Sequence, residues 1–398
     1  MTEAGPPPEV PAEGGATTHD ARRATLRELA WLFGKLGFTA FGGPAAHIAM
    51  MDDEVVRRRQ WLSRERFLDL LGATNLIPGP SSTEMAIHIG HARGGWAGLV
   101  VAGLCFILPA VAIVTAIAWA YVRFGALPEV AGILYGVKPV IIAVVVQALW
   151  NLGRSAVRSY ALAAVGAAAL AAALAGVDEL IVLGLAGAVV ALGRGVATRG
   201  RAASWLPLPL VGATTTAAAA ATPFGLWPLF GVFLKIGSVL FGSGYVLLAF
   251  LRGDLVDRLH WLTESQLLDA VAVGQVTPGP VFTTATFIGY VLGGGSGAAL
   301  ATLGIFLPAF VFVAISGPLV PRIRRSATAG AVLDGVNVAS LALMAQVTLA
   351  LGRAALVDVP AVILAAAGAV LLLRYRLSSA WLVLGGAIVG AVRSYLPW

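Results

Sequence analysis

The chain has 398 residues and is 58% hydrophobic but only 12% charged, whereas roughly a quarter of the residues are charged in soluble domains. Its net charge of +7 comes mainly from arginines between apolar runs, which indicates membrane topology and not a nucleic-acid surface. The single cysteine, Cys105, excludes an intrachain disulfide. The composition therefore predicts an all-α polytopic membrane protein with the lipid bilayer as its surroundings.

Residues 1–24 are rich in Pro, Gly, Thr and acids, and they lack the apolar run of a signal peptide. They are predicted to be a disordered tail. Arg22, Arg23 and Arg27 precede the first apolar stretch, which places this tail and the N-terminus in the cytoplasm.

Residues 25–193 are predicted to form a first transmembrane repeat. Phe41-Gly42-Gly43 interrupts its first helix. Pro78-Gly79-Pro80 interrupts a later one, because proline removes a backbone donor and glycine permits non-helical angles. Two half-helices, Leu68–Ile77 and Ser82–Gly90, should flank this break. The apolar runs that follow approach the roughly 20 residues needed to cross a bilayer, and they are Trp96–Tyr121, Val130–Trp150, Tyr160–Gly176 and Leu180–Leu192.

A linker, 194–224, with one predicted span near Trp205–Thr222, leads to a second repeat at 225–398. Pro78-Gly79-Pro80 recurs 200 residues later as Pro278-Gly279-Pro280. After these segments the offset falls to 199, which pairs Gln147 with Gln346, and both are predicted to make interhelical hydrogen bonds. The apolar runs of the second repeat are Gly297–Gly317, Ala331–Leu351, Val359–Leu373 and Ala380–Val392.

The arginines predict that the two repeats have inverted topology. The loop with Arg322, Arg324 and Arg325 is predicted to be cytoplasmic, whereas its counterpart near Arg123–Pro128 is predicted to lie outside. Two inverted repeats and a linker helix give about 13 spans. The arginines at 57–59 would then lie outside, although loops rich in arginine usually lie in the cytoplasm. The alternative is that the Pro-Gly-Pro segments are re-entrant hairpins, with a different number of spans.

A half-helix that begins after each Pro-Gly-Pro predicts an anion site. Free N–H groups and the positive end of the helix dipole attract anions, and inverted repeats bring two such ends to one centre. The alternative is a structural kink in which hydroxyl groups bind the freed carbonyls. The residues predicted to contact the anion are Lys35, Gly42, Gly43, Asn75, Pro78, Gly79, Pro80, Ser81 and Ser82 in the first repeat, and Lys235, Gly242, Gln275, Pro278, Gly279, Pro280, Thr283 and Thr284 in the second.

Four ionisable residues in apolar stretches are candidates for function. Lys35 and Lys235 could neutralise the anion, because an intramembrane lysine is costly, or they could snorkel to the interface. Glu84 and His88 lie one helical turn apart, so they could relay protons, although capping and surface roles are the alternative. His88 becomes Phe287 in the second repeat, so the repeats differ in chemistry.

Several motifs are missing from the sequence. It has no Walker-type loop, no HExxH and no potassium-channel filter. We therefore predict no enzyme activity, no cofactor and no metal site. A membrane enzyme that acts on lipid phosphate would have only Glu84 and the nearby histidines to use.

The quoted segments resemble the chromate ion transporter family in its long two-domain form. The resemblance rests on Phe41–Pro44, Trp61-Leu62, Leu68-Asp69, Pro78–Pro80 and Phe106–Pro109. It implies a chromate transporter in the plasma (inner) membrane that exports chromate, confers resistance and uses the proton gradient. Sulfate matches chromate in charge and shape, so a sulfate or other oxyanion transporter stays open, as do a passive anion channel and a homodimer.

Overall fold

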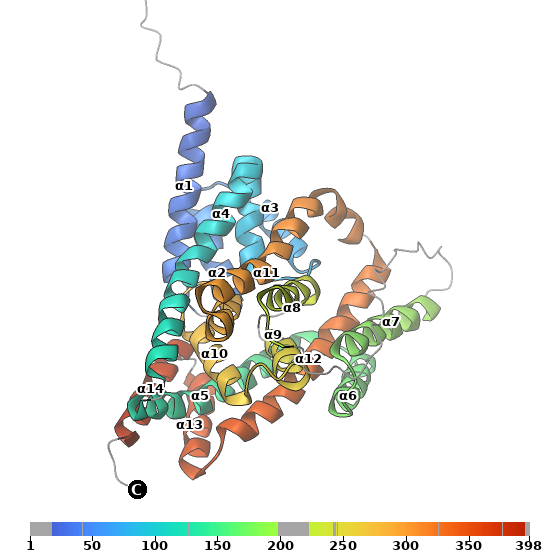
Figure 1. Cartoon of the computed structure of the whole chain (residues 1–398). Helices are drawn as coiled ribbons and strands as arrows, with labels where there is room; N and C mark the ends of the chain where they lie inside the picture. Colours follow the sequence, from blue (N-terminus) through green and yellow to red (C-terminus); the bar gives the residue numbers. More distant parts are fainter. Residues whose placement is uncertain are drawn as a thin grey trace, which may run out of the picture.

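The computed structural model describes residues 18–41, 43–125, 127–197, 223–241, 244, 246–324, 326–375 and 377–394 (Figure 1). All regular structure within these residues is helical, which confirms the predicted class. Gly42, Gly242, the first 17 residues and the predicted linker span lie outside the described residues.

The first repeat consists of seven α-helices and one π-helix within these residues. They are α1 (Thr18–Thr39), α2 (Gly43–Asp52), η1 (Asp53–Arg58), α3 (Arg64–Thr74), α4 (Ser81–Phe124), α5 (Pro128–Ala156), α6 (Tyr160–Leu174) and α7 (Glu179–Ala197). The hydroxyl of Ser63 caps α3 by accepting a hydrogen bond from the Arg66 backbone N–H at 3.1 Å. This half-helix ends at Thr74, three residues earlier than predicted, because a turn at Asn75 and Leu76 precedes the proline.

The second repeat contains the same succession of elements. They are α8 (Leu226–Val239), α9 (Leu247–Leu251), η2 (Arg252–Arg258), α10 (Glu264–Val276), η3 (Val281–Thr283), α11 (Thr284–Arg324), α12 (Ala327–Ala355), α13 (Val359–Tyr375) and α14 (Ser379–Ser394). Thr263 and Gln266 form a capping box at the start of α10, where the first repeat has the Ser63 cap. The short 3-10 helix η3, which has no counterpart in the described part of the first repeat, lies where the offset changes from 200 to 199.

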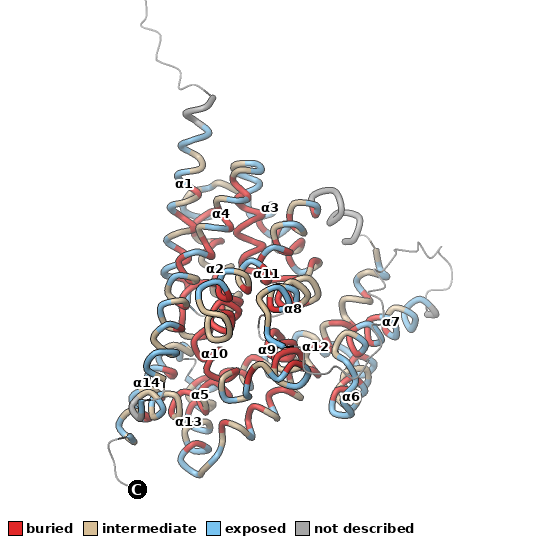
Figure 2. Tube along the Cα trace, viewed as in Figure 1, coloured by how far each residue is buried: buried red, intermediate tan, exposed pale blue. Residues whose placement is uncertain are grey.

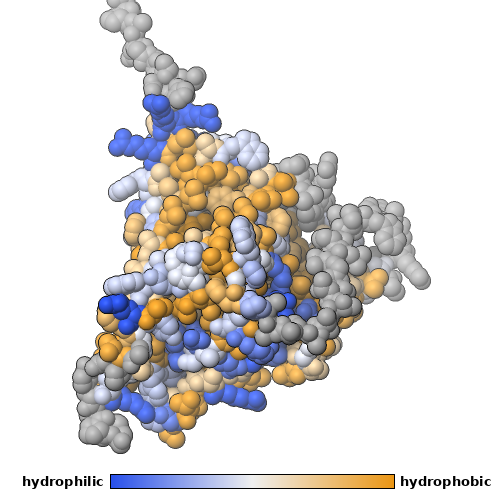
Figure 3. All heavy atoms as spheres, viewed as in Figure 1, coloured by the Kyte–Doolittle hydropathy of each residue, from blue (hydrophilic) through white to orange (hydrophobic). Residues whose placement is uncertain are grey.

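Four helices in the described part of the chain are long and apolar enough to cross a membrane. They contain the segments Ser81–Phe124, Val130–Ala156, Val281–Ser316 and Ala327–Ala355. Buried residues of these helices lie toward the middle of the bundle and exposed ones toward its outside (Figure 2). Apolar residues such as Leu108 and Ile315 are among the exposed ones. Apolar side chains gather over the upper part of the bundle on the face shown in Figure 3, with hydrophilic side chains among and below them. Such a surface is expected where lipid, and not water, surrounds the helices.

Helices α4 and α11 each fold back on themselves at a pair of glycines. Gly95 has φ +58° and Gly294 has φ +61°, a backbone conformation that favours glycine. A Cβ atom on Gly90 would collide with the Gly98 carbonyl, so the segments on either side of the bend are in contact. Each long helix is therefore a short half-helix followed by a longer one that reverses direction.

The short half-helix of α4 also lies beside α3. The Arg93 guanidinium, at the end of this half-helix, lies 5.3 Å from the centre of the Trp61 ring, just before α3. In the second repeat, the Phe224 ring contacts Trp261 at 5.3 Å between ring centres, and Gly293 packs on the same phenylalanine. The two half-helices thus form a hairpin in each repeat, with Pro-Gly-Pro at its tip.

The repeats exchange their last two helices. Helices α6 and α7 pack on α12 of the second repeat, and α13 and α14 pack on α5 of the first (Figure 1). At the second contact, Gly136 and Gly386 let the two backbones touch, because a Cβ atom on either glycine would collide with the other's carbonyl group. Gly335 meets Gly187 in the corresponding place between α12 and α7.

Two glutamines join the exchanged helices. The Gln147 side-chain amide donates to the Leu372 carbonyl at 3.3 Å, and the Gln346 amide donates to the Ala173 carbonyl at 3.0 Å. These bonds are equivalents of one another under the repeat offset. The prediction of interhelical hydrogen bonds from Gln147 and Gln346 is confirmed.

Candidate functional site

The two Pro-Gly-Pro tips meet the opposite repeat through backbone hydrogen bonds. The Gly79 N–H donates to the Leu240 carbonyl at 2.8 Å, and the Gly279 N–H donates to the Ala40 carbonyl at 2.9 Å. Gly79 has φ +137° and Gly279 has φ +90°, so both positions favour glycine. These two N–H groups are occupied, and an anion bound near the tips needs other donors.

An open cavity of about 670 Å³ lies beside the first tip. It is bounded by α2, by the break between α3 and α4, by the second half of α5 and by α12 of the other repeat. Neutral polar side chains line much of it, and they are Thr74, Asn75, Ser81, Gln147, Asn151, Ser155, Asn337 and Ser340. Amides and hydroxyls can donate hydrogen bonds to the oxygens of an oxyanion.

Arg158 and Asp334 are the charged residues in the cavity lining. The Asp334 carboxylate is paired with Arg194 on α7, with 2.7 Å between Nη1 and Oδ2. The Arg158 guanidinium donates to the nearby Ser155 carbonyl at 2.9 Å. An anion in the cavity would therefore meet one lining guanidinium and one carboxylate whose charge is already balanced.

Part of the predicted site lies in this cavity. Asn75 and Ser81 line it, and Pro44 lines it directly after Gly43, which begins α2 with φ +79°. Gly79, Pro80 and Ser82 are buried and do not line the cavity. Sequence reasoning missed the other donors, above all Asn151 and Asn337. A signal existed for Asn151, because it follows Gln147 by one helical turn inside an apolar run.

The second tip is packed shut. The segment Gln275–Pro280 is buried except for partly exposed Val276, and none of it lines the cavity. The Thr283 hydroxyl donates to the Pro280 carbonyl and the Thr284 hydroxyl to the Val281 carbonyl, both at 2.8 Å. These hydroxyls bind the freed carbonyls, which was the alternative to anion binding.

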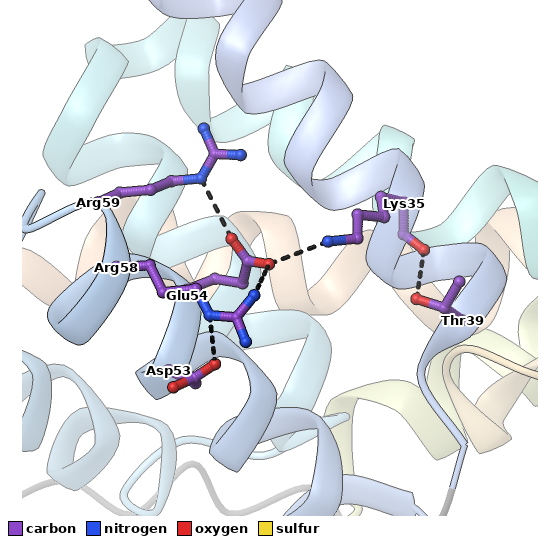
Figure 4. Close-up of polar contacts among 6 residues, drawn as sticks. All are labelled: Lys35, Thr39, Asp53, Glu54, Arg58 and Arg59. Atoms are coloured by element: carbon purple, nitrogen blue, oxygen red, sulfur yellow. Dashed lines mark hydrogen bonds and ion pairs between the residues drawn. The ribbon is translucent and has the colours of Figure 1, made fainter.

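The two predicted lysines lie away from the cavity, in equivalent ion pairs. Lys35 Nζ lies 3.0 Å from Glu54 Oε1, and Lys235 Nζ lies 2.7 Å from Asp254 Oδ1 (Figure 4 shows the first pair). Burial alone raises the pKa of Glu54, but hydrogen bonds and charge from Lys35 and Arg59 hold that pKa below its ordinary value. Each lysine ties the first helix of its repeat to a π-helix, so anion contact by Lys35 or Lys235 stays a prediction.

Glu84 lies directly beneath the first tip. Its carboxyl group is fully buried, and neither oxygen has a hydrogen-bond partner among the described residues. A Cβ atom on Gly79 would collide with this carboxyl group. His88, one turn further along α4, is also buried, and its Nε2 lacks a partner within the same residues. An acid and an imidazole in such a place can hold a proton.

The comparisons with known proteins agree with the sequence resemblance. The sequence model of a family described as "Chromate transporter" matches residues 27–192 and 227–391. A "Chromate transport protein" of Cupriavidus metallidurans is 33% identical over 97% of both chains. A protein of the same description from Pseudomonas aeruginosa is 33% identical over 82% of this chain and 81% of its own. A "Probable chromate transport protein" of Synechococcus elongatus is 32% identical over 84% of this chain and 87% of its own. No solved structure matches.

Proposed function

Because the chain belongs to the chromate transporter family, we propose that it carries chromate across the cell membrane through the cavity beside the first Pro-Gly-Pro. The observation that carries this proposal is the set of amides and hydroxyls that converge there from both repeats. Chromate is a tetrahedral dianion with four acceptor oxygens. Asn75, Ser81 and Asn151 supply donors from the first repeat, and Asn337 supplies one from the second.

The cavity suits an ion that must leave again. Neutral donors and a single lining arginine hold an anion less firmly than several fixed cations would, and transport requires release. The positive end of the α4 dipole, at Ser81, adds attraction without a further side-chain charge.

The repeats, at 25–193 and 225–398, are in our proposal related by a two-fold axis in the membrane plane. Two observations support this arrangement. The tips exchange equivalent hydrogen bonds, and the last helices of each repeat pack on the other. The arginine distribution favours opposite orientation, with the N-terminus in the cytoplasm. The hairpins with Pro-Gly-Pro tips support the re-entrant alternative over 13 full crossings.

Glu84 and His88 are in our proposal the residues that couple transport to protons. Glu84 contacts the tip whose Gly79 N–H holds the second repeat, so a change of charge on its carboxyl group acts directly on that link. In the second repeat Thr283 and Phe287 take these places, so only the first tip can titrate in this way. We also propose that the protein exports chromate from the cytoplasm across the inner membrane, which would make the cell resistant to chromate.

Flux of labelled chromate into proteoliposomes, with and without an imposed proton gradient, tests the function. We expect saturable flux that the gradient accelerates and that Asn151→Ala reduces. Glu84→Gln should still bind chromate but lose the response to the gradient. Equal flux in the Asn151→Ala variant would move the site out of the cavity.

The proteoliposomes also separate chromate transport from sulfate transport and from a passive channel. Sulfate flux faster than chromate flux would make the protein a sulfate transporter. Conductance that never saturates and ignores the proton gradient would make it a passive channel. Cross-linking in the liposomes would show whether a homodimer forms.

A further inference from the structure

A second cluster of charged and polar residues, none of which lines the cavity, connects α4, α5 and α10. Asp269 on α10 is 2% exposed, and its Oδ1 lies 3.1 Å from the Nζ of Lys138 on α5. The Tyr121 hydroxyl on α4 donates to Asp269 Oδ2 at 2.9 Å. Lys138 also donates to Ser265 Oγ at 2.7 Å. The cluster joins two helices of the first repeat to α10 of the second.

The repeat offset relates this cluster to the cavity. Asp269 is the equivalent of Asp69 on α3, and Lys138 is the equivalent of Asn337, which lines the cavity. Asn151 and Ser155 in the cavity correspond to Ala350 and Ala354. Lys138 of the cluster therefore occupies, under the repeat offset, the position of a residue that lines the cavity, Asn337.

The two hairpins also differ in how closely they pack on the central helices. Helix α10 packs on α5 and on α12, and Leu268 on it is 1% exposed. Its equivalent on α3, Leu68, is 47% exposed, and Asp69 beside it is exposed as well. One hairpin thus leaves a space against the central helices α5 and α12, while the other is closed on them.

We propose that Lys138, Asp269 and Tyr121 form a gate that closes the substrate pathway at the second hairpin while the first hairpin is open. In the opposite access state, the first hairpin is closed and the second is open. In that state α3 closes on α12, which brings Asp69 to Asn337, and α10 moves away from Lys138. This inference rests on the proposed transport function, because it assigns the two access states that transport requires.

The sequence makes the two closed forms unequal. A lysine beside a carboxylate in a dry interior attracts it by charge and by hydrogen bonds, whereas an asparagine offers a hydrogen bond alone. The form with Lys138 on Asp269 is therefore favoured, and the form with Asn337 on Asp69 is populated less. Exchanging lysine and asparagine between the two positions should reverse that preference.

Cysteine labelling with a membrane-impermeant maleimide tests the gate. The native Cys105 is first replaced by alanine, and single cysteines are placed at Ser81 in the cavity or at buried Gln275 in the second hairpin. We expect fast labelling at the first position and slow labelling at the second. In the Lys138→Asn/Asn337→Lys double variant the first rate should fall and the second should rise, each by about tenfold.

Two further variants make the result decisive. Lys138→Arg keeps the charge, so its labelling pattern should match that of the parent. Asn337→Lys alone adds a partner for Asp69, so it should slow labelling at Ser81→Cys even if variants without Lys138 fail to reach the membrane. Unchanged rates in Asn337→Lys would overturn the proposal. Labelling is measured without chromate, so this failure is distinct from a failure of chromate transport.

Discussion

The two Pro-Gly-Pro hairpins share one sequence pattern and one backbone path, yet one is open and the other is closed. The first has exposed Asn75 at its tip and a cavity of about 670 Å³ beside it. The second has buried Gln275, and its threonine hydroxyls bind their own backbone. Both tips nonetheless donate an equivalent N–H to the other repeat. The backbone contacts thus hold the repeats together, while the side chains decide which hairpin has room for a ligand.

The glycine at each tip should give the largest effects, of two different kinds. An alanine at either position adopts a strained backbone, at about 1–3 kcal/mol. At Gly279 the new Cβ would also lie 2.8 Å from the Ala110 Cβ and 3.1 Å from the Gly37 carbonyl oxygen. Gly279→Ala should therefore lower the melting temperature in detergent. At Gly79 the new Cβ would collide only with the Glu84 carboxyl group, so Gly79→Ala should abolish chromate flux while the fold survives.

Equal melting temperatures and equal fluxes in these two variants would contradict the division between a structural tip and a functional one. Gly34→Ala is a suitable control, because nothing lies within 4 Å of the new Cβ at this helical position. It should match the parent in both measurements.

The cavity donors should come next. Asn151→Ala gives the first repeat the residue that the second repeat has at the equivalent position, Ala350. The loss of one hydrogen bond to an anion, about 1–3 kcal/mol, should reduce flux about fivefold or more. The reciprocal change, Ala350→Asn, should alter flux much less, because that side is closed. A larger loss of flux in Ala350→Asn than in Asn151→Ala would place the substrate on the side of Ala350, against our proposal.

The lysine pairs should follow, with stability as the readout. In Lys235→Met, buried Asp254 keeps Arg258, whose Nη2 lies 2.7 Å from Asp254 Oδ1, as its ion-pair partner among the described residues. Lys35→Met leaves Glu54 with both Arg58 and Arg59. We expect a loss of about 2–3 kcal/mol for Lys235→Met and about 1 kcal/mol for Lys35→Met, because removal of one partner strands a buried charge.

Thermal unfolding of the double variant Lys235→Met/Asp254→Asn gives the control, and most of the stability should return. Chromate binding should persist in both single variants. Loss of binding in a stable Lys35→Met protein would return the lysine to the anion site.

The hydroxyls should give the smallest effects. Thr283→Val removes a hydrogen bond to the Pro280 carbonyl and should cost about 1 kcal/mol of stability without a change in flux. Ser81→Ala removes a cavity donor and should lower flux a few-fold without a change in stability. Flux that depends on Thr283 and ignores Ser81 would reverse our assignment of the two hairpins.

Much of the local structure was predictable, because its causes are local. Pro-Gly-Pro breaks a helix wherever it occurs, so the half-helices were expected on either side of Pro78 and Pro278. The duplication was visible in the sequence as a nearly constant offset. The intramembrane glutamines had to find partners, and the hydrogen bonds of Gln147 and Gln346 confirm this.

The rest depends on contacts between segments that are distant in sequence. Nothing near Lys35 shows that its partner is Glu54, which is reached only after the chain turns back through α2 and η1. Asn151 and Asn337 line the same cavity because α5 and α12, which come from different repeats, pack together. The sequence shows that Asn337 in the second repeat stands where the first repeat has Lys138. It does not show which hairpin each of these residues faces, and that depends on the packing of the two repeats.

The exchange of helices has a consequence for how the protein is made. The ribosome delivers α5 early, but the helix that covers its Gly132 and Gly136 is α14, the last one described. Until α14 has been translated, the glycine face of α5 therefore lies in the bilayer without its partner. A chain that stops before Ser379 would leave that face uncovered for good. The first repeat is thus fully packed only after the last described helix of the second repeat has been made.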